Sequence, residues 1–250
     1  MLPDLIVIGA MKCGTSALHQ YLDAHPAISM APQKEVNFFN GPDPAPPGDD
    51  ATWWRTGQWH RCIDWYAEQF DSSAPLRGEA SPAYTSPDNP EVAQRMASVV
   101  PAVRLLYLVR DPLQRALSQY AHHRRDGAEP RDVCEALLDP DSQYLARSRY
   151  FERLCPFLRV FDPAQVHVVV RERLLTDRSG ELARVYAHVG ADPDWRCAVQ
   201  QREFHVGNGP VEASPRLRAA FAERVADDVA RLRELLGQDL TEWSRCRPTT

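Results

Sequence analysis

The stretch LIVIGAMKCGTSAL at residues 5–18 constrains the fold more than any other part of the chain. Its four leading apolar residues predict a short buried strand. A loop that contains Gly9 and Gly14 follows the strand, and a helix is expected over 15–24. Unpaired N–H groups at the positive end of a helix dipole attract anions, and glycine lets the backbone approach them closely. The stretch therefore predicts a phosphate-binding unit.

The loop nearly matches the Walker A pattern, G-x-x-x-x-G-K-[ST], and departs from it at one place. Thr15 stands where the pattern has its lysine, and the lysine of this loop is Lys12. In P-loop enzymes the later lysine reaches the β- and γ-phosphates and the next hydroxyl binds Mg²⁺. The displaced lysine disfavours a nucleoside triphosphate and favours a shorter anion bound without metal. A strand–loop–helix turn with no ligand is the alternative.

A second signal is the segment APQKEVNFFN at residues 31–40, in which Lys34 and Glu35 precede two phenylalanines. A carboxylate at the edge of a buried aromatic cluster is a candidate general base, because partial desolvation raises its pKa toward the working range. The pattern alone favours a surface glutamate beside core aromatics. Residues 41–60 hold three tryptophans in a polar loop, which fits a lid over a ligand as well as a loop pinned to the core.

A third signal lies at the apolar strand predicted over 103–109 and the helix predicted over 113–125. Arg110 leaves the end of that strand, and Ser118 lies two turns into the helix on the face turned toward the strand ends. The two side chains could therefore hold one phosphate. Taken alone, an arginine at a strand end is more often an ion-pair partner.

The rest of the chain continues the alternation of strands and helices. Further strands are expected at 76–84 and 166–170, and further helices at 61–70, 87–100, 142–160, 179–189 and 214–236. This order predicts an α/β fold with three layers, in which helices flank a central, mostly parallel sheet and ligands bind beyond the carboxyl ends of the strands. We expect one domain over residues 1–250, since no linker divides the chain.

Composition excludes several classes of function. A net charge of −5 disfavours nucleic-acid binding, and the scattered cysteines indicate neither a zinc site nor a disulfide framework. No apolar run approaches the ~18 residues of a membrane span, and a strand beginning at Leu5 leaves no room for a signal peptide. We therefore expect a cytoplasmic protein without a membrane partner. Lysine occurs only at Lys12 and Lys34 among 29 basic residues, a bias that indicates a GC-rich bacterial genome.

Five stretches, in this order, resemble the sulfotransferase family over most of residues 5–189: KCGTSAL, KEVNFF, GEASPAY, LLYLVRDPLQRALSQY and RSRY. The nearest resemblance is to the branch that includes glycosaminoglycan sulfotransferases and many bacterial enzymes. The resemblance implies a P-loop-like fold and a reaction that moves a sulfonate group from 3′-phosphoadenosine 5′-phosphosulfate (PAPS) to a hydroxyl. It implies no metal.

The resemblance also implies roles for particular residues. Glu35 would be the catalytic base, Lys12 would lie near the bridging oxygen of the donor, and Arg110 with Ser118 would hold the 3′-phosphate. Tyr150 would lie near the same nucleotide, and Arg202 with the region of Gly207 would supply later contacts. The loop residues expected to hold the 5′-phosphosulfate are Lys12, Cys13, Gly14, Thr15 and Ser16.

Two departures from the family pattern affect the acceptor. The lysine that assists at the reaction centre of glycosaminoglycan enzymes is Ala80 here, and the histidine two residues after the catalytic glutamate is Asn37. With the negative net charge, these changes favour a small-molecule or natural-product hydroxyl, and a phenol more than an alcohol, over a sulfated glycan. The alternatives are an ATP-dependent kinase, with Asp111 as its candidate Mg²⁺ ligand, and a nucleotide-binding module without catalysis.

Overall fold

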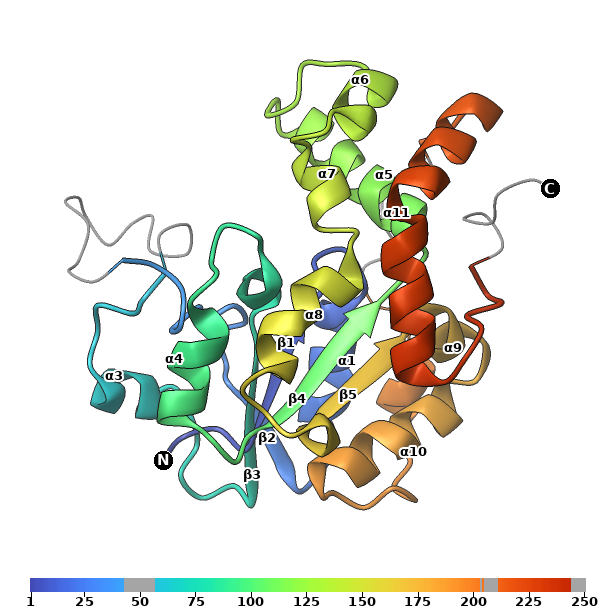
Figure 1. The fold of residues 1–250 in the computed structure, drawn as a ribbon. Helices are drawn as coiled ribbons and strands as arrows, with labels where there is room; N and C mark the ends of the chain where they lie inside the picture. The colour runs from blue at the N-terminus through green and yellow to red at the C-terminus, as the bar shows by residue number, and fades with distance from the viewer. Residues whose placement is uncertain (43–56, 203, 205–210, 244–250) are drawn as a thin grey trace.

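A five-stranded parallel sheet forms the centre of the molecule, with strand order β2-β3-β1-β4-β5 (Figure 1). The computed structural model describes residues 1–42, 57–202, 204 and 211–243. The strands are β1 Leu5–Gly9, β2 Ile28–Met30, β3 Leu76–Ala80, β4 Arg104–Val109 and β5 Val166–Val170. The predicted α/β class and parallel sheet are confirmed. Because all the strands run the same way, the loops that follow them gather at one edge.

The central strand β1 explains why the first apolar run is so short and so complete. All five of its residues are buried, since neighbouring strands cover both of its edges and helices cover both faces. The Cα of Val7 is in register with Ala80 of β3 on one side and with Leu106 of β4 on the other. The phosphate loop therefore leaves the middle of the sheet, between the segments that follow β3 and β4.

Helices lie on both faces of the sheet, as a three-layer fold requires (Figure 1). One face carries α4, α8 and α11, which pack side by side, and the other carries α1 and α10. The α-helices are α1 Thr15–Asp23, α3 Ile63–Ala67, α4 Val92–Val99, α5 Pro112–Arg125, α6 Val133–Leu138, α7 Gln143–Ala146, α8 Tyr150–Leu158, α9 Arg171–Thr176, α10 Arg178–Val189 and α11 Pro215–Leu236. Short 3₁₀ helices cover Pro82–Thr85, Pro163–Gln165 and Ala198–Gln201. Helices α6 and α7 stand above the carboxyl edge of the sheet.

The single helix predicted over 142–160 is wrong, because the chain breaks between α7 and α8. At the break, Ser148 is fully buried and its Oγ lies 2.8 Å from the carbonyl oxygen of Tyr144. A new helix then begins where the carboxylate of Asp228 accepts two backbone N–H groups of the first turn of α8, at 2.8 and 3.0 Å. These partners are distant in sequence, so periodicity could not reveal the break.

Other differences concern short elements and boundaries. The helix predicted over 87–100 begins at Val92, and the helix predicted over 61–70 is limited to α3. Sequence reasoning missed β2, α6 and α9, which have six residues or fewer. A signal for α6 was present, since Asp132 and Glu135 form a capping box at its start.

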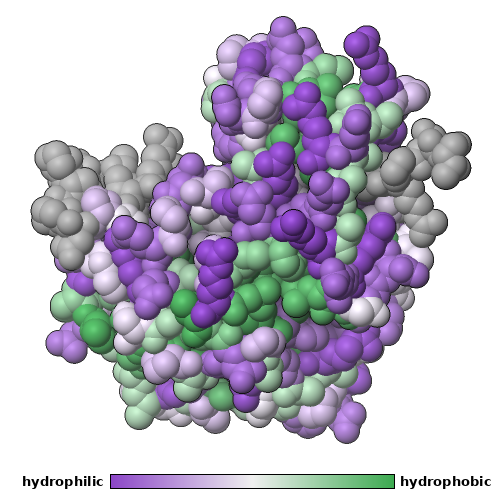
Figure 2. Space-filling view, in the orientation of Figure 1, coloured by the Kyte–Doolittle hydropathy of each residue, from purple (hydrophilic) through white to green (hydrophobic). Residues whose placement is uncertain are grey.

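The surface in Figure 2 is polar above the sheet, and apolar side chains gather near the middle of this face. Inside, one apolar cluster runs from Leu5 in β1 to Trp243 after α11. No helix in the described part of the chain has the length and apolar character needed to cross a membrane. The expected single domain and cytoplasmic location stay predictions.

Candidate functional site

The loop after β1 leads to the start of α1, where the sequence predicts an anion site. Gly14 is the N-cap of α1 and has a φ of 99°, a left-handed conformation that glycine adopts without a Cβ penalty. Because glycine has no side chain to cap the helix, and no acidic residue lies in the first turn, the N–H groups of Thr15 and Ser16 point toward the loop without a protein carboxylate. The predicted strand, loop and helix are therefore present.

Gly9 has a different role from the one its place in the pattern suggests. A Cβ on Gly9 would lie 2.2 Å from Oγ1 of Thr85 and 2.9 Å from Cε2 of Tyr107. Glycine is needed there because Thr85 and Tyr107 pack against it, and the predicted close approach of an anion to Gly9 stays a prediction. Of the two loop glycines, Gly14 is the one whose conformation shapes the anion site.

Lys12 lies in a strongly positive environment. Burial lowers its pKa from the ordinary value of 10.5, and the positive charge of Arg125 lowers it further. Arg110 and Arg115 act in the same direction, while Asp126 opposes them. The positive charges of these residues act against one another, so an anion bound beside Lys12 would reduce the repulsion.

Arg110 contacts the loop directly, as its position after β4 predicts. Its Nη1 donates a hydrogen bond to the carbonyl oxygen of Lys12 at 3.5 Å. The next residue, Asp111, caps α5 by accepting the N–H of Gln114 at 2.9 Å, and its own N–H is held by Glu172 Oε1 at 3.0 Å. Asp111 is buried in this capping role, which disfavours it as the Mg²⁺ ligand of a kinase.

The two arginines of the RDPLQR motif, Arg110 and Arg115, have different environments. Arg115 is fully buried and donates to Oγ of Ser148 at 2.8 Å, to Oε1 of Gln119 at 2.7 Å and to the carbonyl of Tyr144 at 2.6 Å. These partners occupy its guanidinium in holding α5 to α7. Arg110, at the edge of the loop, is the arginine available to a ligand.

Ser118 and His122 occupy the same face of α5, one turn apart, and both are partly exposed. Burial lowers the pKa of His122, and the nearby charge of Lys12 lowers it further. Its Nδ1 lies 2.7 Å from Nη2 of Arg125 and its Nε2 lies 3.4 Å from Asp126 Oδ2. Both ring nitrogens of His122 thus have partners at the end of its own helix.

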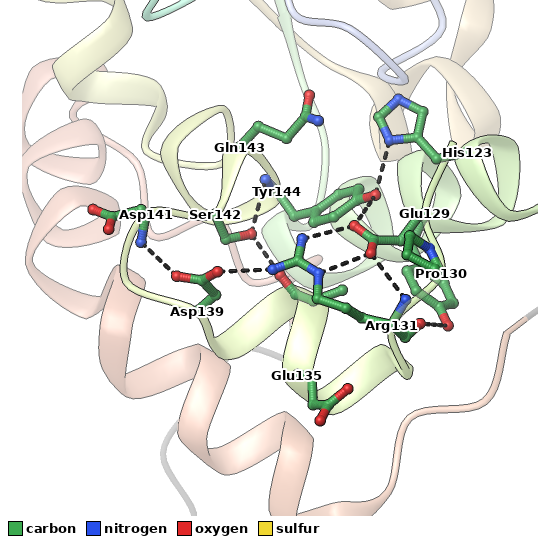
Figure 3. A network of polar contacts seen from close by, with 12 residues as sticks. His123, Glu129, Pro130, Arg131, Glu135, Asp139, Asp141, Ser142, Gln143 and Tyr144 are labelled. Carbon is green, nitrogen blue, oxygen red and sulfur yellow. Dashed lines mark hydrogen bonds and ion pairs between the residues drawn. The ribbon is translucent and has the colours of Figure 1, made fainter. Parts of the chain in front are cut away.

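The neighbouring His123 belongs to a polar network between α5 and α7 (Figure 3). The hydroxyl of Tyr144 donates to Glu129 at 3.1 Å, so Nδ1 of His123, 2.8 Å from that oxygen, is the donor in their contact. Arg131 binds both oxygens of Glu129 at 2.8 Å and holds the pKa of that carboxyl well below its usual range. His123 therefore has a structural role here.

Glu35 is a surface glutamate beside core aromatics, as the pattern alone favours. Its side chain is 48% exposed and pairs with Lys34 at 2.5 Å, so it is not the partly desolvated carboxylate of the alternative interpretation. The backbone, however, is held at the site: the N–H of Glu35 donates to the carbonyl of Ala80 at the end of β3, at 3.0 Å. Phe38, further along, is buried as predicted. The role of base stays a prediction.

Backbone conformation sets the proposed site apart from the rest of the described chain. Four described non-glycine residues have positive φ, and three belong here: Lys12 (68°), Glu35 (67°) and Asn37 (55°). Such conformations are uncommon for residues with a Cβ and persist where surrounding contacts enforce them, often at functional sites.

A buried network under Glu35 enforces this conformation. Glu79 accepts hydrogen bonds from Ser81 at 2.6 Å, Tyr66 at 2.5 Å and Tyr84 at 2.8 Å. Burial raises the pKa of Glu79, and these hydroxyl donors oppose the increase. Oγ of Ser81 also accepts the N–H of Asn37 at 3.0 Å, so one hydroxyl ties the segment of Glu35 to β3.

We expect Ser81→Ala to lower the free energy of unfolding by about 1–3 kcal/mol, because it leaves the buried N–H of Asn37 without its acceptor and removes a donor to Glu79. Urea unfolding of both proteins measures the difference. Ser98→Ala is the matched control, since Ser98 is exposed and bonds only within its own helix. Equal losses for the two variants would contradict this role of Ser81.

Cys13 and Tyr150 turn away from the loop surface into the core. Both are fully buried, and Sγ of Cys13 lies 3.5 Å from the hydroxyl of Tyr150. Burial raises the pKa of the Cys13 thiol to about 11. The side chains support the loop from behind, so a ligand could meet only the backbone of Cys13.

The remaining predictions fall partly outside the described residues. Trp53, Trp54 and Gly207 lie outside them. Trp59 packs against the core, with the guanidinium of Arg95 4.8 Å from its ring centroid, so this end of the loop is pinned. The carbonyl of Arg202 accepts from the Tyr21 hydroxyl at 2.7 Å, in the last turns of α1, whereas the phosphate loop is at the start of that helix.

Sequence reasoning missed one basic residue at the loop. Arg171 follows β5, and its side chain lies over Gly14, with Cδ and Nε 3.6 Å from the place a Cβ would take. The buried strand before it was recognised, but no motif marked the residue after it. Within the described ranges, no group of three or more His, Cys, Asp or Glu residues could hold a metal ion.

Comparison with known proteins places the chain among sulfotransferases. The family model described as "Sulfotransferase family" matches residues 3–196. The crystal structure of a sulfotransferase from Alicyclobacillus acidocaldarius is 31% identical, covers 98% of this chain and 99% of its own, and superposes with a TM-score of 0.81.

Curated relatives agree over shorter stretches. Heparan sulfate glucosamine 3-O-sulfotransferase 5 from Homo sapiens is 31% identical over 206 residues, which are 77% of this chain and 54% of that protein. Membrane-associated sulfotransferase kil1 from Dictyostelium discoideum is 37% identical over 124 residues, 48% of this chain and 22% of its own length. The chain thus spans about a fifth to about half of these relatives.

Proposed function

This chain belongs to the sulfotransferase family, and we propose that it transfers a sulfonate group from PAPS to the hydroxyl of a small-molecule, natural-product or carbohydrate acceptor. The observation that carries the proposal is a hydrogen bond between residues of two separate sequence motifs. Arg110, after β4, donates to the carbonyl of Lys12 in the loop after β1. That contact supports the proposal because it brings a side chain able to bind phosphate next to a helix start able to bind an anion.

The residues of the loop fit a phosphorylated donor. The first turn of α1 has no side-chain cap. Burial lowers the pKa of Lys12, and the charges of nearby arginines lower it further. Lys12 with the amides of Thr15 and Ser16 would hold the 5′-phosphosulfate, and Arg110 with Ser118 the 3′-phosphate. The donor supplies the sulfonate group, and the chain supplies positioning and charge neutralisation.

In the proposed reaction a bond forms between the acceptor oxygen and sulfur while the bond from sulfur to the 5′-phosphate oxygen breaks. Glu35 takes the proton of the acceptor hydroxyl. The electron pair of the broken bond stays on the phosphate, where Lys12 and the first-turn amides of α1 stabilise the added charge. The products are a sulfate ester and adenosine 3′,5′-bisphosphate.

We infer a phenol or similarly acidified hydroxyl as the acceptor. The position of the family lysine is Ala80, which is fully buried, and the cation beside Glu35 is Lys34, at 2.5 Å. A phenol, with a pKa near 10, needs less help from a base and its cations than an aliphatic alcohol does. The net charge of −5 also opposes binding of a sulfated glycan. Labelled PAPS with matched panels of phenols, alcohols and oligosaccharides tests this choice.

Two rival functions make different predictions. A kinase would turn over ATP with Mg²⁺, whereas Asp111, its candidate metal ligand, is committed to capping α5. A binding module without catalysis would retain the nucleotide and show no turnover of labelled PAPS with any acceptor in the panel. A bacterial, cytoplasmic enzyme that tailors natural products would meet such small acceptors, and this setting is part of the proposal.

We expect the protein to bind adenosine 3′,5′-bisphosphate about 10- to 150-fold more tightly than adenosine 5′-monophosphate, in the absence of Mg²⁺. We attribute the difference to hydrogen bonds from Arg110 and Ser118 to the 3′-phosphate, and the range corresponds to a net gain of about 1.5–3 kcal/mol, the worth of one hydrogen bond to a charged group. Calorimetry with EDTA present measures both affinities. Equal affinities would refute the assignment of Arg110 and Ser118.

A further inference from the structure

Arg171 and Arg110 occupy equivalent positions on neighbouring strands. The Cα atoms of Val109 and Val170 are partners in the ladder between β4 and β5, and each arginine is the next residue along its strand. Parallel strands deliver such residues side by side at the carboxyl edge of the sheet. The protein thus places two arginines together beside the phosphate loop.

The two side chains reach different parts of that loop. Arg110 Nη1 donates to the carbonyl oxygen of Lys12. Arg171 extends past the end of β4 to Gly14, where its Cδ and Nε lie 3.6 Å, and its Cγ 3.8 Å, from the position that a Cβ on this glycine would occupy. Gly14 is the N-cap of α1, so Arg171 lies where the dipole and the first-turn amides of that helix already favour negative charge.

We propose that Arg171 binds the 5′-phosphate of the sulfonate donor. This inference rests on the proposed function and adds to it a residue that the loop pattern does not contain. A guanidinium presents several N–H donors in a plane and binds two phosphate oxygens at once. The 5′-phosphate gains charge when its bond to sulfur breaks, so Arg171 serves both the bound donor and its departing phosphate.

Arg171 could also lie over Gly14 only because its aliphatic side-chain atoms pack there. Comparing ligands with and without the 5′-phosphate distinguishes phosphate binding from such packing. Adenosine 3′,5′-bisphosphate and adenosine 3′-monophosphate differ only in the 5′-phosphate. A residue that binds this group matters for the first ligand alone. A residue that merely supports the loop affects both ligands alike.

We expect Arg171→Ala to weaken binding of adenosine 3′,5′-bisphosphate about 10- to 100-fold in calorimetry, and binding of adenosine 3′-monophosphate by less than about threefold. Arg171→Lys keeps the aliphatic side chain and the positive charge but loses the planar guanidinium. It should therefore lose less affinity than Arg171→Ala, and only for the bisphosphate. Arg173→Ala is the matched control, because Arg173 lies on α9 and pairs with Glu242 at 2.6 Å. It should bind both ligands like the parent.

Equal losses for the two ligands, or no loss for either, would overturn this inference and leave the proposed function intact. A parent protein that binds neither ligand would overturn both. Thermal unfolding of each variant, compared with the parent, shows whether the altered protein is folded. If Arg171→Ala is unfolded, the affinities of Arg171→Lys for the two ligands are compared instead.

Discussion

Glu35→Gln should lower kcat by about 10²- to 10⁴-fold and leave the affinity for adenosine 3′,5′-bisphosphate nearly unchanged. Glutamine keeps the size of the side chain but cannot accept the proton of the acceptor hydroxyl. The change also breaks the ion pair with Lys34, yet an exposed pair contributes only about 0–1 kcal/mol to stability. Steady-state rates with labelled PAPS and calorimetry on the same preparations measure the two quantities.

Glu91→Gln is the matched control for this change. Glu91 is another exposed glutamate paired with a cation at 2.5 Å, Arg95, and it lies on the edge of α4. Its variant should keep the parental rate. His122→Ala should also stay active, since both ring nitrogens of His122 are engaged within α5. An active Glu35→Gln together with an inactive His122→Ala would transfer the role of base to that histidine.

Lys12→Ala should lower kcat about 30- to 1,000-fold, with a smaller change in donor KM. Its charge is most useful when the departing phosphate becomes more negative, and removing one such contact costs about 2–4 kcal/mol in the transition state. Arg110→Ala should show the opposite balance, with donor affinity reduced more than kcat. Arg104→Ala removes an exposed cation at the opposite end of β4 and serves as the control for charge alone, so it should keep the parental kcat. A Lys12→Ala enzyme with the parental kcat would exclude the leaving-group role.

The same lysine predicts the alkaline limb of the pH profile. Burial and the neighbouring arginines lower the pKa of Lys12 below 10.5 in the protein without ligand. As pH rises through that lowered pKa, Lys12 loses its charge, so kcat/KM for the donor should fall at a lower pH than for a solvent-exposed lysine. In Lys12→Ala this limb should be absent.

The central sheet and the phosphate loop could be predicted because their signals are local. An apolar run followed by a glycine-bearing loop and a helix describes β1 and α1 in sequence order, and the apolar run of β4 with Arg110 does the same for the next strand. In a parallel sheet, ligand-binding residues lie at the carboxyl ends of the strands, so their position follows from the fold class. These features needed no knowledge of which strands are neighbours.

The features that could not be predicted depend on partners far away in sequence. Gly9 is required by Thr85 and Tyr107, and the backbone of Glu35 is held by the carbonyl of Ala80 at the end of β3. Arg110 and Arg115 look alike within one motif, and only tertiary packing shows that Arg115 is enclosed. Arg171 reaches the loop because β5 is next to β4, a register that no single stretch contains.

The central place of β1 has a consequence for how the protein is made. Residues 5–9 leave the ribosome well before β3 and β4, the strands that cover their two edges. At a synthesis rate of ~5–20 residues per second, both edges of the nascent apolar segment remain unpaired for on the order of ten seconds. Throughout that time it is a template for wrong pairing with other chains. The segment that leads into the proposed donor site is therefore also an aggregation-prone part of the newborn chain until β3 and β4 cover its edges.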